Sequence, residues 1–183
     1  NGIRWAVKSQ GTSVRENYSL GTSQSIHYQT VSGSQDNGTS IRVKDKWVEF
    51  YGADGMEAII HPLNNNWFIG SFQYGGRRLS KNGGLTSSGG NPAGQSGSGN
   101  ADWIAPMAYD PNDHMTVYHF SKNVWRSTDF TQNWTLLGSP TTFSTEIQQA
   151  AIAENNSDIM VVSRGAAIEK STDGGMTFSN IRR

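Results

Sequence analysis

The sequence predicts an all-β fold, a partial β-propeller of about four to five blades with four strands each. Three segments share one plan: an apolar strand, an Asn/Asp/Pro turn, a second apolar strand, and a third strand running into a Ser-x-Asp or Ser-x-Asn turn. The serines that begin these turns, Ser80, Ser127 and Ser171, are 47 and 44 residues apart, close to the ~40–50 residues of one blade. No segment keeps a 3.6-residue apolar period, so almost no helix is expected.

The repeats divide residues 1–183, taken as one propeller segment, into successive blades. The approximate limits are 1–20 for the outer strands of a partial blade, then 21–52, 53–100, 101–140 and 141–183. Within 21–52, apolar and β-branched runs predict strands at 26–33, 39–43 and 46–51. The stretch 83–100 contains seven glycines, four serines and no aromatic residue. Because it cannot bury apolar surface, we expect a long mobile loop between two blades.

The composition fits short strands and tight turns and excludes several classes of protein. Lys plus Arg and Asp plus Glu number 15 each, so no net field favours nucleic acid or a membrane surface. Cysteine is absent, the four histidines are scattered, and no apolar run reaches the ~18–20 residues of a membrane span. We therefore expect no metal, no cofactor and no membrane insertion. The chain starts without Met and ends directly after a strand-like run, which is typical of a fragment or a mature piece.

The turn at 171–178 has a physical logic of its own. The side chain of Asp173 can accept hydrogen bonds from backbone N–H groups ahead of it and so close the turn. Gly175 can take a positive φ at no steric cost, and Phe178 can pack between neighbouring sheets. Ser171 and Thr177 fill the remaining defined positions. We expect this turn and its two partial copies to be structural.

The pattern Ser-x-Asp-x-Gly-x-Thr-Phe resembles the Asp box, or BNR repeat, of sialidases, sortilin-type receptors, xyloglucanases and many secreted Bacteroidetes proteins. The partial copies lie at Ser127, Asp129 and Trp134, and at Ser80 with Asn82 in place of Asp. Segments 33–39 and 52–55 resemble the TQDNG and GGDGG stretches of multi-blade glycoside-hydrolase-like proteins. The resemblance implies that the boxes are structural staples on the outer rim and that the protein is extracellular or at the cell surface.

Functional residues of propellers usually lie on loops that lead into the innermost strands on one face of the disc. The candidates for ligand binding are Gln35, Asp36, Asn37, Glu57 and Trp103, and those for catalysis are Asp54 and Asp102. A pair of carboxylates entering inner strands could act as acid and base on a glycosidic bond, and Trp103 could stack on a sugar ring. The alternative interpretation is that 36–38 and 54–55 are turns selected for backbone conformation.

Two functions remain open at this stage. The first is a non-catalytic extracellular module that recognises protein or polysaccharide through its loop-bearing face. The second is a fragment of a xyloglucanase-like glycoside hydrolase acting on polysaccharide. The first is favoured because no pair of acids stands out beyond turn chemistry, and a sialidase is disfavoured because no Arg-Ile-Pro segment is present.

The expected partners are the remaining blades of a larger chain or another protein chain, with polysaccharide as a further partner. The reason is that an open stack of blades exposes unpaired sheet edges and apolar faces. The alternative architecture is a compact four-bladed ring, sealed by N-terminal strands that join the final blade.

Overall fold

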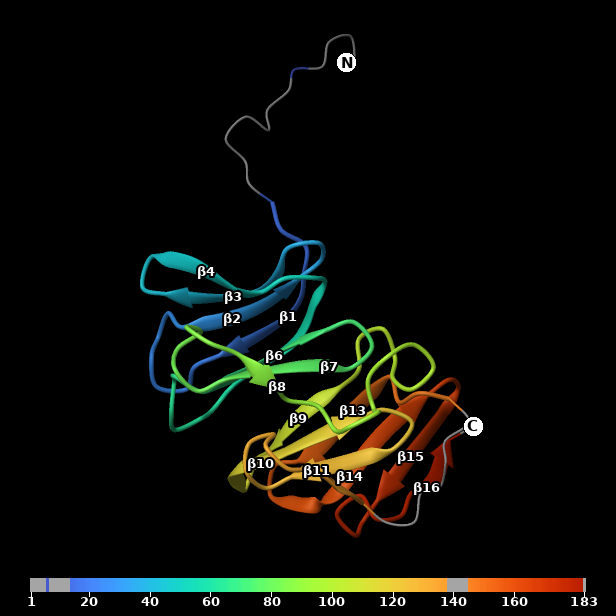
Figure 1. The fold of residues 1–183 in the computed structure, drawn as a ribbon. Coiled ribbons are helices and arrows are strands. Elements are labelled where there is room, and N and C mark those ends of the chain that lie inside the picture. Colours follow the sequence, from blue (N-terminus) through green and yellow to red (C-terminus); the bar gives the residue numbers. More distant parts are fainter. Residues whose placement is uncertain (1–5, 7–13, 138–144, 183) are drawn as a thin grey trace.

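Four antiparallel sheets of four strands each follow one another along the chain in the computed structural model, which describes residue 6 and residues 14–137 and 145–182 (Figure 1). The first sheet comprises β1 (Asn17–Thr22), β2 (Thr30–Ser34), β3 (Gly38–Val43) and β4 (Lys46–Tyr51). The second comprises β5 (Gly55–Ile60), β6 (Phe68–Phe72), β7 (Gly76–Ser80) and β8 (Ser88–Gly89).

The third sheet comprises β9 (Met107–Asp110), β10 (Asp113–Phe120), β11 (Val124–Ser127) and β12 (Thr135–Leu136). The fourth comprises β13 (Gln149–Ala153), β14 (Asn156–Arg164), β15 (Ala167–Ser171) and β16 (Ser179–Arg182). In every sheet the strands lie side by side in chain order. Over the described residues, none of the secondary structure is a helix that could cross a membrane.

The first strands of the four sheets line a common axis. β1 lies against β5, β5 against β9, and β9 against β13, while the later strands of each sheet fan outward (Figure 1). Each sheet is therefore one blade, with its first strand innermost. The prediction of an all-β partial propeller is confirmed.

The core consists of three apolar clusters, one in each space between neighbouring sheets. Because side chains alternate along a strand, a central blade must be apolar on both faces. On β6, Phe68 enters the cluster shared with the first sheet and Ile69 enters the cluster shared with the third. On β10, Val117 and Tyr118 likewise face opposite neighbours. The paired apolar runs of the sequence reflect this two-sided burial.

The limits of the first blade differ from those expected. β1 begins at Asn17 and pairs with β2 through Leu20 and Ser32, so residues 17–20 belong to the first sheet and not to a preceding partial blade. β2 also begins at Thr30, later than the strand expected at 26–33. β1 was not predicted because its sequence, NYSLGT, has only two large apolar residues, Tyr18 and Leu20, and neither of them is buried. The rest of the expected partial blade, 1–5 and 7–13, lies outside the described residues.

The glycine-rich stretch 83–100 is also more structured than expected. It contains β8, in which Ser88 pairs with Leu79 and Gly89 with Arg78. Further along, Gly97 N donates to Tyr74 O at 2.8 Å. The stretch thus supplies the outermost strand of the second blade before it crosses to the third. Side chains gave no signal for β8 because both of its residues are exposed and only the backbone pairs.

The fourth sheet is completed by its own outer strand. β16 pairs with β15 through Asn180 and Glu169, so no N-terminal strand is needed to finish this blade. The described N-terminal strand therefore does not join the final blade, and the rest of the N-terminal segment on which the ring alternative depends, 1–5 and 7–13, lies outside the described residues. β1 instead forms the inner edge of the first sheet.

Candidate functional site

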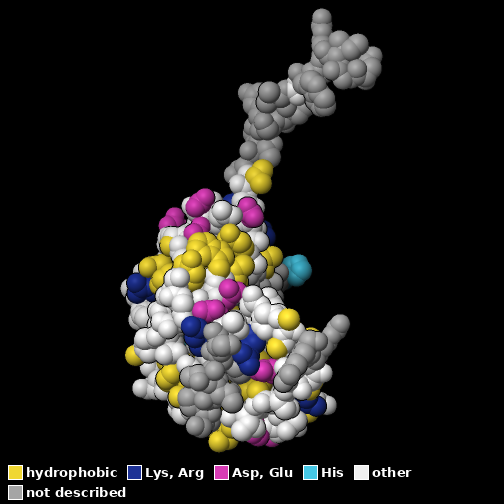
Figure 2. Space-filling model, turned by 90° about the vertical axis from the view of Figure 1, so that its right-hand side faces the viewer, with side chains coloured by type: hydrophobic (Ala, Val, Ile, Leu, Met, Phe, Trp, Pro, Cys, Tyr) yellow, Lys and Arg dark blue, Asp and Glu magenta, His cyan; other side chains and the backbone are white. Residues whose placement is uncertain are grey.

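The loops that enter the inner strands and the loops that join the second and third strands of each sheet lie at the same end of the blades. We call this end the loop face; it carries residues 35–37, 52–54, 73–75, 90–106 and 121–123. Backbone hydrogen bonds connect these loops, from Tyr74 N to Trp103 O at 3.1 Å and from Lys122 N to Asn100 O at 2.8 Å. Figure 2 looks onto this end and shows hydrophobic side chains gathered beside acidic ones.

Asp54 joins the loops of the first two sheets. Its Oδ1 accepts a hydrogen bond from Asp36 N at 2.8 Å, and its Oδ2 accepts one from Gln73 Nε2 at 3.1 Å. Asp36 has a φ of 55°, a left-handed conformation that Asp tolerates better than most residues. Both oxygens of Asp54 therefore accept hydrogen bonds that connect the two loops.

Gln35 and Asn37 stabilise the same turn. Asn37 Nδ2 donates to Gln35 O at 2.8 Å, and Tyr18 OH donates to Gln35 Oε1 at 3.1 Å. The next residue, Gly38, has a φ of 64°, and a Cβ there would lie 2.1 Å from Tyr51 O. The structure therefore brings Gln35, Asp36, Asn37 and Asp54 together, in contacts that shape the loops.

Two aromatic pairs lie on or beside the loop face. Trp103 stands edge-on to Tyr74, with 5.1 Å between ring centroids and 85° between ring planes. Trp103 is 37% exposed, and we call it and Tyr74 the aromatic platform. Tyr51 and Phe72 form the second pair at 5.2 Å, with the Arg78 guanidinium 4.6 Å from the Tyr51 centroid. Asp102, directly before Trp103, is partly exposed.

Glu57 lies apart from these loops, in a groove of about 350 Å³ along the axis. The groove is lined by residues of the four inner strands and the turns after them: Ser19, Leu20, Glu57, Ala58, Ile59, Met107, Ala108, Tyr109, Pro111, Ile152 and Glu154. Ser19 Oγ donates to Glu57 Oε2 at 3.1 Å. Two carboxylates therefore reach this groove, and Glu154 was not among the candidates from the sequence.

The Ser-x-Asp turns lie at the opposite end of the blades, because β7, β11 and β15 each run from the loop face into one of them. Ser171 Oγ donates to Asp173 Oδ1 at 2.7 Å and accepts from Gly175 N at 2.9 Å. Asp173 Oδ1 also accepts from Thr177 N at 2.9 Å, and Thr177 Oγ1 donates to Asp173 Oδ2 at 2.5 Å. The hydroxyl and backbone N–H of Thr177, followed by Ser171, lower the pKa of Asp173 to about 2.

The two partial copies close in the same way. Ser127 Oγ donates to Asp129 Oδ1 at 2.8 Å, and Asn133 Nδ2 takes the place of the threonine hydroxyl by donating to Asp129 Oδ2 at 2.6 Å. In the first copy, Asn82 Oδ1 accepts from Thr86 N at 3.0 Å and from the Ser80 hydroxyl at 3.1 Å. The terminal aromatics Trp134 and Phe178 pack against inter-sheet clusters.

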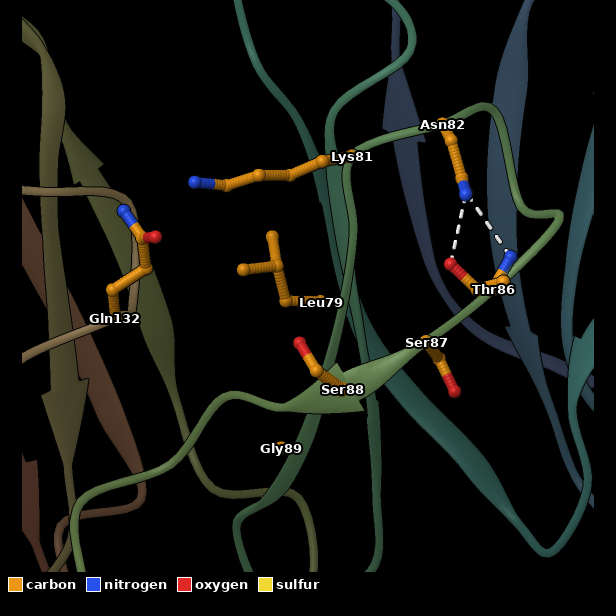
Figure 3. A pocket seen from close by; sticks show the side chains of 8 residues that line it. All are labelled: Leu79, Lys81, Asn82, Thr86, Ser87, Ser88, Gly89 and Gln132. Atoms are coloured by element: carbon orange, nitrogen blue, oxygen red, sulfur yellow. Dashed lines mark hydrogen bonds between the residues drawn. The ribbon is translucent and has the colours of Figure 1, made fainter.

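A polar groove of about 420 Å³ lies beside the first of these turns (Figure 3). Asn82 and Thr86 on one side and Gln132 of the third sheet on the other line it, with Ser87 and Ser88 along its floor. Because Asn82 and Thr86 form hydrogen bonds with each other, their side chains close the turn and are not free to bind a ligand.

Sequence reasoning did not single out Tyr74, Gln73 or the Tyr51–Phe72 pair. The pattern that could have indicated them is the segment Ser71-Phe72-Gln73-Tyr74-Gly75, in which two aromatic residues lie in or next to a turn that ends in glycine. Among the described residues there is no group of three His, Cys, Asp or Glu side chains that could hold a metal ion.

No known protein family and no curated protein matches the chain in sequence. Solved structures of GH74 enzymes match it in fold. An ancestral GH74 enzyme has a TM-score of 0.71 at 13% identity, over 91% of this chain and 24% of that one. The GH74 enzyme of Niastella koreensis has a TM-score of 0.64 at 21% identity, over 92% of this chain and 30% of that one.

A GH74 xyloglucanase from Xanthomonas campestris has a TM-score of 0.71 at 13% identity, over 91% of this chain and 30% of that one. At these identities the likeness shows the fold alone. The chain is therefore a segment with the architecture of GH74 propellers, and it spans 24–30% of the length of these enzymes.

Proposed function

We propose that this chain is part of an extracellular Asp-box β-propeller that binds a polysaccharide across its loop face without hydrolysing it. The aromatic platform of Tyr74 and Trp103 is the observation that carries the proposal. Rigid, partly exposed aromatic rings offer the apolar face on which a pyranose ring stacks, and neighbouring polar groups fix its orientation. The similar structures described as GH74 enzymes, one of them a xyloglucanase, support a glucan as the ligand.

The engagement of Asp54 supports binding rather than hydrolysis. A glycosidase needs two carboxyl groups that face the glycosidic bond from opposite sides. The two oxygens of Asp54 accept hydrogen bonds from Asp36 N and Gln73 Nε2. Glu57 lies in the axial groove and accepts a hydrogen bond from Ser19 Oγ. Asp102 is the remaining acid of the original candidates beside the platform.

We further propose that the three Ser-x-Asp/Asn turns are BNR repeats that act only as structural staples. Their partners are all within the turn or the adjoining strand, and they lie at the end of the blades away from the platform. The outward-facing sides of the first and fourth sheets pack, in this proposal, against further blades of a larger chain. Trp47 of β4 and Ile181 of β16 are each about half exposed.

Titration calorimetry with a xyloglucan oligosaccharide tests the binding function. Replacing Trp103 by Ala removes half of the platform, and we expect the affinity to fall about tenfold or more. Trp47, which is 52% exposed at the far end of β4, provides the matched control, and its replacement by Ala should leave the affinity unchanged. Equal affinities for the wild type and the Trp103→Ala variant would refute the proposal.

A second candidate, a glycoside hydrolase that uses Asp102 as one acid, is favoured only by the likeness to GH74 enzymes. Release of reducing sugar from xyloglucan by the wild type, abolished in an Asp102→Asn variant that still binds the oligosaccharide, would establish hydrolysis and overturn the non-catalytic proposal. We expect no sugar release from either protein.

A further inference from the structure

β4 is the outermost strand of the first sheet and the longest of the four outermost strands (Figure 1). It has six residues, whereas β8 and β12 have two each and β16 has four. Very short outer strands are one way in which proteins keep the edge of a sheet from pairing with another chain. β4 is too long to be protected in this way.

The backbone of β4 presents unpaired polar groups toward the outside of the sheet. The two-residue turn 44–45 joins β3 to β4, and Val43 pairs with Lys46 across it. Residues that flank such a turn exchange both backbone hydrogen bonds, and bonded and non-bonded pairs then alternate along the strands. The N–H and C=O groups of Trp47 and Glu49 therefore point away from β3. Within the described part of the chain these groups have no hydrogen-bond partner.

The side chains of β4 are exposed on both faces of the sheet. This holds for Lys46, Trp47, Val48 and Glu49, and Trp47 is 52% and Val48 48% exposed. Because successive side chains of a strand point to opposite faces, one large apolar side chain lies uncovered on each face. The charges of Lys46 and Glu49 cancel, so a second copy of the same strand is not repelled. The edge is thus suited to pairing with itself.

Symmetry and charge favour one register for two antiparallel copies of β4. Residues directly opposite each other share a face, so a two-fold axis must pass beside a residue that faces its own copy. An axis at Val48 or at Glu49, near the middle of the strand, pairs the most residues. An axis at Glu49 would place this acid opposite itself, and like charges directly opposite are destabilising. An axis at Val48 avoids this and sets Trp47 opposite Glu49 of the second copy.

We propose that two copies of this chain associate through β4, antiparallel and centred on Val48, into one continuous sheet of eight strands. Trp47 and Glu49 of the second copy exchange both backbone hydrogen bonds, and the two-fold axis repeats this pair. Val48 meets its own copy in a pair without backbone hydrogen bonds, where side chains approach each other most closely. The interface uses the edge of the sheet and not its faces, so it depends neither on further blades nor on the proposed binding of polysaccharide.

Sedimentation velocity of residues 1–183 over a range of concentrations up to about 1 mM tests the proposal. Proline removes an N–H group, and at an edge position whose N–H points outward it leaves the pairing with β3 intact. Glu49→Pro should therefore weaken the dimer, of twice 20.0 kDa, about tenfold or more. Glu49→Ala, which keeps the N–H group, is the matched control and should dimerise like the wild type. Association that is unchanged in Glu49→Pro, or a wild type without a dimer, would overturn the proposal.

Disulfide cross-linking gives a second readout that does not depend on how the proline variant folds. The chain has no cysteine, so each single Cys variant can link only to its own copy. Val48→Cys places two thiols in a directly opposite pair with Cα atoms about 4.5 Å apart, which a disulfide spans. In Lys46→Cys, on the same face, the two positions are about 14 Å apart.

In a glutathione buffer, Val48→Cys should therefore form the covalent dimer much faster than Lys46→Cys. Equal rates for the two variants, or faster linking of Lys46→Cys, would show that the strands do not pair around Val48 and would overturn the proposal.

Discussion

At the scale of single residues, Asp173 and Asn82 show two ways in which a side chain can close the same kind of turn. Asp173 accepts hydrogen bonds from two backbone N–H groups and two hydroxyls. Asn82 keeps the bonds from the Ser80 hydroxyl and Thr86 N, and its amide donates to Thr86 Oγ1 instead of accepting from it. An amide therefore reproduces much of the network that the carboxylate forms, and this explains why the first copy tolerates Asn.

Replacing Asp173 should consequently have graded effects. We expect Asp173→Ala to lower Tm clearly more than Asp173→Asn, because Asn can still accept from Thr177 N and the Ser171 hydroxyl, as Asn82 does in its own turn. Differential scanning calorimetry of the two variants measures the order. If Asn and Ala lowered Tm equally, the acceptor role of this side chain would be wrong.

We expect His61 to make the folded protein less stable in mild acid. Burial, followed by the charge of His114, lowers the pKa of His61, and its Nδ1 accepts hydrogen bonds from Leu63 N and Asn64 N, both at 3.1 Å. The folded state thus favours the neutral ring. Since the folded pKa is below the unfolded value of 6.5, this stability is present above pH 6.5 and is lost as the pH falls below it.

Urea unfolding between pH 7 and pH 5 measures this dependence. The His61→Asn variant retains an acceptor for the two N–H groups but does not titrate, so its stability should fall less over this range than that of the wild type. The same replacement at the exposed His27 serves as the matched control and should behave like the wild type. A His61→Asn variant with the full acid dependence would contradict the assignment.

At the scale of elements, the first two blades approach each other backbone to backbone near the axis. A Cβ on Gly33 of β2 would lie 1.8 Å from Met56 O of β5, and one on Gly21 of β1 would lie 2.5 Å from Ala58 O. These glycines are therefore required by close packing and not by a turn. They allow β1, β2 and β5 to share the narrow inner part of the propeller.

This packing predicts the effect of a single methyl group. Gly33→Ala should destabilise the protein by about 1–3 kcal/mol or more, because backbone must move to admit it. Gly89 of β8 has nothing within 4 Å of its Cβ position, so Gly89→Ala should change stability by less than about 0.5 kcal/mol. Urea titration of both variants measures the difference, and two similar values would show that the sheets are not in close contact at Gly33.

The sequence was sufficient to predict the strands whose side chains are buried on both faces, such as β6 and β10, because their apolar runs stand out between turns. It was insufficient for β1 and β8. β1 has only two large apolar residues, Tyr18 and Leu20, neither of which is buried, and β8 pairs only through its backbone. Strand detection from side chains fails where side chains contribute little to the pairing.

The candidate site was predicted in part for a related reason. The turn chemistry of 35–37 and 54 indicated residues that the structure brings together, and Trp103 was visible as an aromatic residue in a loop. Tyr74 was not, because its contact with Trp103 joins loops of two different blades. Such a contact depends on how the blades are placed around the axis, which local sequence patterns do not specify.

At the scale of the whole molecule, the four blades leave the outer faces of the first and fourth sheets without a neighbouring blade among the described residues (Figure 1). Residues 1–183 alone should therefore self-associate as their concentration rises, since exposed apolar faces and sheet edges promote pairing. Multi-angle light scattering measures the mass directly. A monomer of 20.0 kDa at every concentration would contradict the proposal that further blades cover these faces.

The central functional claim is that polysaccharide meets the loop face at Trp103. The six tryptophans of the chain each give an indole N–H signal, so a heteronuclear NMR titration with a xyloglucan oligosaccharide reads all of them in one measurement, with signals assigned through single Trp→Phe variants. The account predicts that the Trp103 signal shifts with saturation while that of Trp47 stays in place. No shift at Trp103, or larger shifts at Trp47 or at Trp134 beside the Ser-x-Asp turns, would contradict it.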